Sequence, residues 1–171
     1  MSQAKKLLQV LMVFILAFSV LLPAHADEAR ADAPISVYVN GKLLNTPQPA
    51  QAINGSTMVP MRAIFEALGA DVKWFGNIQT ISAYDPATDR VLSLVLNNKN
   101  MFCASNQEFK LYADQPTSQA TINFVLQHTQ IIPTAPLLKN GTTLVPVRVI
   151  STALGCSVGW DGATRTVTIN R

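Results

Sequence analysis

The sequence predicts an α+β fold of two tandem units, each with one α-helix and a few antiparallel β-strands. A nine-residue segment beginning at Asn54, Asn-Gly-Ser-Thr-Met-Val-Pro-Met-Arg, returns 86 positions later at Asn140 as Asn-Gly-Thr-Thr-Leu-Val-Pro-Val-Arg. In each copy, helical spacing of apolar residues is flanked by alternating, strand-like segments. A unit kept twice at fixed spacing indicates architecture rather than a catalytic centre, which so short a chain would need only once.

The N-terminal segment has the pattern of a secretory signal peptide. Two lysines precede an apolar run at 7–22, and Ala24 and Ala26 form a small-residue cleavage site. The run is shorter than the roughly 20 residues of a membrane-spanning helix, which favours cleavage over an uncleaved anchor. We therefore expect residues 1–26 to be removed after Ala26. The mature protein would be secreted or cell-wall associated, without a stable membrane span.

Composition gives no indication of binding to nucleic acid or to an anionic membrane. Removing the signal peptide takes away Lys5 and Lys6 and no acidic residue, so the formal net charge falls from +3 to +1. This gives no electrostatic case for binding nucleic acid or an anionic membrane surface. The remaining 145 residues come from a chain that is 49% hydrophobic, enough to fold around one core or two small ones.

Each predicted unit begins with strands that lie outside the repeated motif. The first unit, residues 27–88, opens with a hairpin in which the alternating segment 35–39 turns at Asn40 and Gly41. The second unit, residues 89–171, opens with a strand at 91–96. Its following part, around 101–138, contains two short strand-like segments at 101–103 and 108–111 but is otherwise predicted to be an irregular insert.

The repeated motif opens with a tight turn and continues into a helix. The Asn-Gly pairs Asn54-Gly55 and Asn140-Gly141 favour turns with positive φ. Pro60 and Pro146 can occupy the first helical position, where a missing N–H costs little. Met61, Ile64, Phe65 and Leu68 form an apolar stripe in the first copy, and Val147, Ile150 and Leu154 form one in the second. Gly69 and Gly155 are predicted C-terminal caps.

A second hairpin is predicted after each helix, and each contains a tryptophan. Segments 71–74 and 157–160 alternate and return through Thr-rich segments at 80–83 and 166–169. Trp74 and Trp160 stand where a large ring could cover the helix. We interpret them as core residues, with ligand stacking as the alternative, because buried aromatic rings dominate small cores.

The motif resembles the copper amine oxidase N-terminal domain-like family, also called the stalk domain. The resemblance is carried by Asn-Gly-x-Thr-x-Val-Pro-x-Arg, the helix ending in Leu-Gly, and Val-x-Trp with a closing Thr-rich strand, at 54–83 and again at 140–170. It implies two tandem copies of an α+β unit in which an antiparallel sheet wraps one helix. It also implies an exported protein of a Gram-positive bacterium and a role in protein interaction.

The resemblance does not imply oxidase chemistry. In the amine oxidases, copper is held by three histidines in a different domain, and the mature chain has only His128. We therefore expect no metal and no cofactor.

Two arginines and two cysteines have roles that the sequence leaves open. Arg62 and Arg148 fall in the first helical turn, where the helix dipole disfavours a cation. We interpret them as structural, hydrogen-bonding carbonyl groups of a neighbouring strand, with contacts to an anionic wall polymer as the alternative. Cys103 and Cys156 could pair in a disulfide, because an exported location would permit it; equally, Cys156 could be a buried thiol.

No catalytic motif is apparent, so we predict a non-catalytic secreted or wall-associated binding or spacer module. Its partner would be a cell-wall polymer or another envelope protein, and the oligomeric state is left open. The alternative is a secreted hydrolase acting on cell-wall glycan or peptide. It would use His128 with Cys103 or Cys156, or carboxylates that form no recognised pair.

Overall fold

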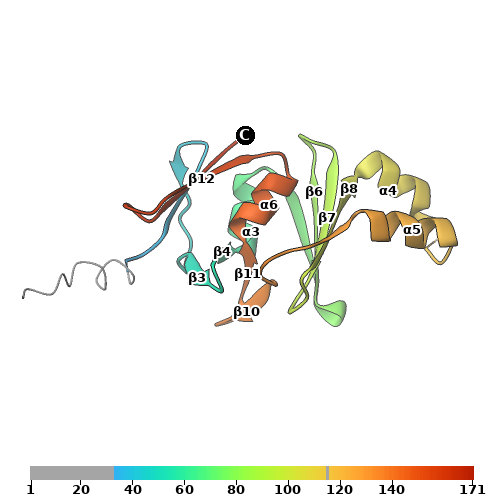
Figure 1. The fold of residues 1–171 in the computed structure, drawn as a ribbon, viewed down its shortest axis with the longest axis horizontal. Helices are drawn as coiled ribbons and strands as arrows, with labels where there is room; N and C mark the ends of the chain where they lie inside the picture. The colour runs from blue at the N-terminus through green and yellow to red at the C-terminus, as the bar shows by residue number, and fades with distance from the viewer. Residues whose placement is uncertain (1–32, 115) are drawn as a thin grey trace, which may run out of the picture. The chain divides into compact units, whose positions relative to one another are not determined.

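The computed structural model describes residues 33–114 and 116–171, so the predicted signal peptide at residues 1–26 lies outside the described residues. Within them the chain forms four α-helices and three β-sheets, which confirms the predicted α+β class. Residues Pro34–Arg171 form one compact unit (Figure 1). Among the described residues, no helix reaches the length and hydropathy needed to cross a membrane.

The central sheet joins the two copies of the repeat directly. Its four strands follow the order β10-β11-β4-β3, with β3 at Gln51–Ile53, β4 at Ser56–Pro60, β10 at Leu137–Lys139 and β11 at Thr142–Pro146. β4 and β11 are antiparallel, and Val59 lies opposite Val145. These valines occupy the same position of the repeat, 86 residues apart, so an approximate two-fold axis passes between them.

Two outer sheets extend the hairpins that follow the helices. One has the order β12-β13-β1-β2: β12 (Ser157–Asp161), β13 (Thr166–Asn170), β1 (Ser36–Val39), β2 (Lys42–Leu43). The other has the order β5-β6-β7-β8-β9: β5 (Asp71–Phe75), β6 (Thr80–Asp85), β7 (Arg90–Val95), β8 (Asn100–Ser105), β9 (Thr129–Ile131). β1 pairs parallel with β13, in the place that the antiparallel β7 takes beside β6. The leading hairpin of the first predicted unit therefore completes the sheet of the second.

The two repeated helices lie at the centre, between the outer sheets (Figure 1). They are α3 (Met61–Ala67) and α6 (Val147–Ala153). Pro60 and Pro146 are the N-cap residues and the last residues of their strands, so each helix begins one residue later than predicted. The predicted turns and caps are confirmed: both Asn-Gly pairs and both capping glycines have positive φ.

The two copies share one hydrophobic core. The apolar stripes of α3 and α6 belong to the same cluster as Val37 of β1, Leu92 of β7 and Ile169 of β13. The predicted boundary at 88/89 falls in the turn between β6 and β7, which pair along their whole length. The arrangement as two tandem units is therefore not confirmed. Ser151, which replaces the aromatic Phe65 in the second copy, is fully buried.

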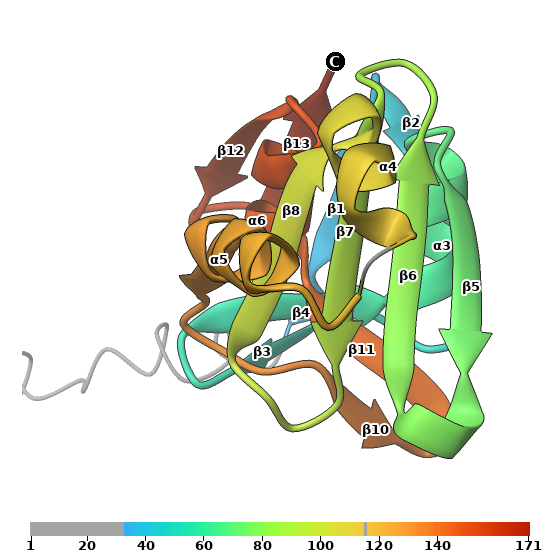
Figure 2. The same ribbon diagram turned by 90° about the vertical axis from the view of Figure 1, so that its right-hand side faces the viewer.

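The prediction of an irregular insert around 101–138 is wrong. This stretch continues the five-stranded sheet and carries two helices, α4 (Asn106–Ala113) and α5 (Gln119–Gln127), which cover the outer face of that sheet (Figure 2). Segment 108–111, predicted as a strand, lies in α4. The Ser105 hydroxyl accepts a hydrogen bond from the Glu108 N–H, and the Ser118 hydroxyl accepts one from the Thr121 N–H. Serine N-caps of this kind fix a helix start in a segment with weak apolar periodicity.

An ion pair between buried Asp85 and partly exposed Arg171 forms a second link between the copies. Asp85 is fully buried, and its carboxylate receives two hydrogen bonds from the Arg171 guanidinium, at 3.1 and 2.7 Å. The same guanidinium donates to the carbonyls of Leu68 and Leu154, at the C-terminal ends of α3 and α6. Asp85 and Arg171 are themselves 86 positions apart, as are Leu68 and Leu154. One cation near the approximate two-fold axis thus satisfies both helix ends.

Candidate functional site

Two open clefts lie beside the repeated helices, and residues of both copies line each of them. The Trp160 cleft, about 390 Å³, combines the start of α6 and strand β12 with the Asn54-Gly55 turn of the first copy. The Trp74 cleft, about 690 Å³, combines the start of α3 and strand β5 with the second copy's turn at Gly141. Both volumes fall in the range of small-molecule sites in proteins.

The two clefts are equivalent under the repeat. Ten lining positions of the Trp160 cleft have their repeat partner in the Trp74 cleft. The ten pairs are Pro47/Pro133, Ala52/Leu138, Gly55/Gly141, Ser56/Thr142, Thr57/Thr143, Pro60/Pro146, Met61/Val147, Arg62/Arg148, Ala63/Val149 and Trp74/Trp160. Because β4 pairs with β11 around the two-fold axis, the turn of one copy faces the helix start of the other. The repeated residues singled out in the sequence are therefore mostly brought together, while Gly69 and Gly155 cap the far helix ends.

Both tryptophans are half-exposed, so their assignment to the core is wrong. Trp74 is 40% exposed and Trp160 44%. They lie on β5 and β12, the edge strands of the outer sheets, where only Val72 and Val158 pack against the core. Each strand runs back from the C-terminal end of its helix, and the tryptophan, two residues beyond the valine, reaches the level of the first helical turn and the cleft.

A glycine lies close to each indole ring. A Cβ atom on Gly76 would lie 3.4 Å from the Trp74 Nε1 atom, and a Cβ atom on Gly162 would lie 3.5 Å from the Trp160 Nε1 atom. The turn after each edge strand therefore passes close to the edge of the ring. Such a Cβ atom would make an ordinary van der Waals contact, and neither residue adopts positive φ, so the structure gives no steric reason for glycine at either position.

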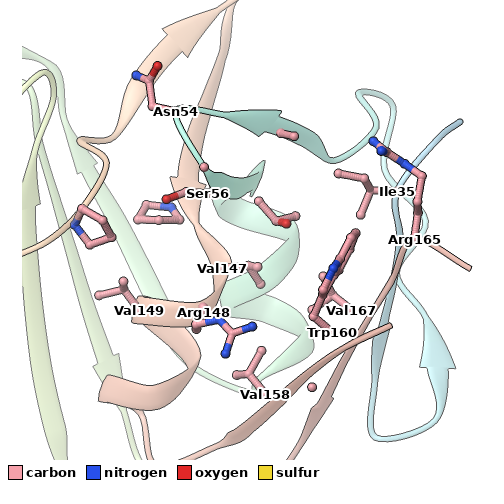
Figure 3. A pocket seen from close by; sticks show the side chains of 16 residues that line it. Ile35, Asn54, Ser56, Val147, Arg148, Val149, Val158, Trp160, Arg165 and Val167 are labelled. Atoms are coloured by element: carbon pink, nitrogen blue, oxygen red, sulfur yellow. The ribbon is translucent and has the colours of Figure 1, made fainter. Parts of the chain in front are cut away.

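Arg62 and Arg148 do not make the hydrogen bonds expected of a structural role. Both are exposed, and neither has a hydrogen bond or ion pair with any residue in the described ranges. Figure 3 shows the Arg148 side chain beside Val147 and Val158, with the Trp160 ring close by. The two guanidinium groups are therefore available to a ligand in their clefts.

Each cleft also contains a polar atom that is buried but lacks a partner among the described residues. In the Trp160 cleft it is Nε of Arg165, and in the Trp74 cleft it is Nε2 of Gln48. Buried donors in native proteins are almost always hydrogen-bonded, to protein or to a bound molecule. The exposed rings, free guanidinium groups and open donors together make these clefts the candidate binding site.

The alternative thiol dyad is not assembled. Phe102 packs on Phe124 and His128 at the outer face of the five-stranded sheet. Neighbouring residues of a strand face opposite sides, and the Cys103 thiol accordingly lies 3.8 Å from the Ala153 carbonyl of α6, on the inner face. The His128 ring contacts the Phe124 carbonyl and Glu108 instead. Cys156 is buried near the Leu154 carbonyl, and both thiols are free.

We expect Cys103 to react slowly with alkylating reagents at neutral pH. Burial raises the pKa of its thiol, an effect that the charge and hydrogen bond of nearby Arg90 only partly oppose. A raised pKa lowers the fraction of thiolate, which is the reactive form. In a Cys156→Ser background, the iodoacetamide rate at pH 7 should be slower than for a free cysteine peptide and should rise as the pH approaches the raised pKa. A faster rate than the peptide would show an activated thiol and revive the hydrolase alternative.

Comparison with known proteins identifies the family of this arrangement. A sequence model of the family described as "Copper amine oxidase N-terminal domain" matches residues 38–169. One match spans both copies of the repeat, so the expectation of two tandem family domains is not confirmed. No curated protein and no solved structure matches the chain.

The family description mentions copper, but the residues of this chain do not fit a copper site. Such a site needs clustered imidazole ligands, and the whole sequence has only two histidines. Within the described ranges, no group of three or more histidine, cysteine, aspartate or glutamate residues is placed to hold a metal ion. We therefore assign no step to copper.

Proposed function

We propose that this chain, which belongs to the copper amine oxidase N-terminal domain family, is a non-catalytic binding module of the cell envelope that holds carbohydrate polymer in its two clefts. The observation that supports the proposal is where the repeated residues lie and which of them stay exposed. Most repeated positions serve the fold, but the arginine and tryptophan of each copy remain exposed and converge with the opposite turn on a cleft.

The chemistry of the clefts suits a polyhydroxylated ligand. The apolar face of an indole packs well against the C–H groups of a sugar ring, while the N–H at its edge can hydrogen-bond to water. Hydroxyl groups of Thr57 and Thr143 and the guanidinium groups of Arg148 and Arg62 surround the rings with donors and acceptors. Because the two clefts are related by the two-fold axis, one polymer or two neighbouring strands could occupy both, which raises the avidity of weak individual sites.

The envelope location rests on the signal-peptide pattern at residues 1–26. If the chain is exported as proposed, mass spectrometry of protein recovered from the medium or the wall should give Asp27 as the first residue. Recovery of the intact N-terminus would contradict cleavage.

Incubation of the purified protein with insoluble cell walls of a Gram-positive bacterium tests the binding function. We expect the protein to sediment with the walls, to saturate, and to release neither reducing sugar nor peptide. Release of fragments would favour the hydrolase alternative. Failure to sediment would contradict a wall-binding module. Albumin of similar concentration serves as the control for trapping.

A further inference from the structure

The two clefts differ in charge although they share ten lining positions. The Trp160 cleft is lined by Arg148 and Arg165, and its lining contains no acidic residue. The Trp74 cleft is lined by Arg62 and Glu66, whose formal charges cancel. The difference arises at two repeat positions: Arg165 corresponds to Gln79 in the first copy, and Glu66 corresponds to Thr152 in the second. The electrostatic environment therefore distinguishes two sites of similar shape.

Arg165 is held in its cleft by a backbone hydrogen bond and by partial burial of its side chain. Its backbone has a φ of 51°, nearly that of Gln79 at 49°, in the turn that joins the two strands of the hairpin. Its carbonyl accepts a hydrogen bond from the Ser36 N–H at 3.1 Å, which ties the turn to β1. Its Nε atom is buried and has no partner in the described part of the chain. A guanidinium held with a desolvated, unsatisfied donor interacts more strongly with an anion than one in open water.

The aromatic and cationic groups of this cleft converge. In the view of Figure 3 the Trp160 ring lies between the side chains of Arg148 and Arg165, and Ile35, Val158 and Val167 add apolar groups to the lining of the cleft. A ring that stacks on the indole would direct a substituent at its rim toward a guanidinium on either side. A planar fork of N–H donors fits a carboxylate or a phosphate in bidentate fashion.

We propose that the Trp160 cleft is selective for a saccharide bearing an anionic group, a carboxylate or a phosphate, which Arg148 and Arg165 hold while Trp160 packs on the sugar ring. The Trp74 cleft accepts the uncharged counterpart. This inference rests on the proposed carbohydrate-binding function and specifies its ligand. An acidic peptide is the competing occupant, but it offers no ring for the indole and fewer hydroxyl partners for the polar rim.

The repeat provides matched variants for the test. Arg165→Gln introduces the residue that the first copy carries at the same backbone conformation, so the turn is expected to fold normally. Glu66→Thr likewise introduces the residue of the second copy and removes the negative charge from the Trp74 cleft. Arg62→Gln is the control for Arg148→Gln. Circular dichroism and the melting temperature of each variant verify its fold.

Calorimetric titrations with trigalacturonate, its carboxyl-reduced counterpart and glucose 1-phosphate test the selectivity. For trigalacturonate we expect Arg148→Gln and Arg165→Gln each to weaken binding about tenfold or more, because each removes a charge-assisted contact. Arg62→Gln should weaken trigalacturonate binding much less than Arg148→Gln does, because Glu66 already offsets the positive charge of the Trp74 cleft. Glu66→Thr should strengthen trigalacturonate binding at the Trp74 cleft. Arg148→Gln should weaken binding of the carboxyl-reduced sugar much less than it weakens binding of trigalacturonate. The carboxylate and phosphate probes then show which anion is preferred.

Three results would overturn the inference. Equal losses from Arg148→Gln and Arg62→Gln would show that the clefts do not differ in selectivity. Equal affinity for trigalacturonate and its reduced counterpart would leave a carbohydrate module without charge preference, so the proposed function would survive and this inference would fail. Tighter binding of a tri-glutamate peptide than of trigalacturonate would identify an acidic peptide as the ligand. If none of the saccharides binds the wild type, the inference fails, and sedimentation with cell walls decides whether the proposed function fails with it.

Discussion

Arg171→Met should lower the free energy of unfolding by about 3–5 kcal/mol, the cost of leaving a buried charge without its partner. Asp85 is fully buried and would retain only the hydrogen bonds from the Ala87 N–H and the Thr88 hydroxyl. The carbonyls at the ends of α3 and α6 would lose a donor at the same time. Denaturant unfolding followed by circular dichroism measures the change.

A matched control and a double variant separate the ion pair from a general effect of losing an arginine. Arg62→Met removes an exposed arginine without partners in the described ranges, and should change stability by no more than about 0.5 kcal/mol. Asp85→Asn combined with Arg171→Met leaves no buried charge, so it should recover part of the loss. A loss below about 1 kcal/mol for Arg171→Met alone would show that the pair does not hold the copies together.

The second large effect concerns binding. Replacing both Trp74 and Trp160 with alanine should abolish sedimentation with cell walls, because each cleft loses the ring on which a sugar would stack. The cost in stability should be only about 1–2 kcal/mol, below the roughly 3–5 kcal/mol of a fully buried tryptophan, since both rings are half-exposed. Either single replacement should leave partial binding through the other cleft.

Phe75 is the control for this experiment. It is also exposed, at 43%, and follows Trp74 on the same edge strand, but it does not line the cleft. Phe75→Ala should therefore leave sedimentation unchanged. If the double tryptophan variant unfolds while sedimentation of its folded fraction is unaffected, the rings are structural, as the sequence first suggested.

The local structure of the repeat could be predicted because local chemistry determines it. The Asn-Gly turns, the apolar stripe of α3 and the glycine caps follow from backbone preferences and helical spacing. The pairing of β4 with β11 and of β1 with β13 depends on contacts far apart in the sequence, and no local pattern specifies it. The predicted arrangement as two tandem units is not confirmed, because the two copies share one hydrophobic core.

The prediction from the sequence missed the candidate site, because it assigned both tryptophans to the core on the ground that large aromatic rings are usually buried. Trp74 and Phe75 are neighbours on one strand, so they face opposite sides of the sheet and cannot both enter one core. That adjacency was a signal that this edge strand carries rings outside the core. A repeated arginine without a repeated acidic partner, as at Arg62 and Arg148, was a second signal. Both clefts then required the structure, because each is completed by the turn of the other copy.

Single-tryptophan fluorescence tests the central claim that each cleft is a ligand site. The chain has two tryptophans, one in each cleft, so Trp74→Phe and Trp160→Phe leave one reporter apiece. We predict that soluble cell-wall glycan fragments change the emission of both variants in a saturable manner and protect both rings from a neutral quencher. An unchanged emission and unchanged quenching for both tryptophans, under conditions in which the protein sediments with walls, would contradict the claim.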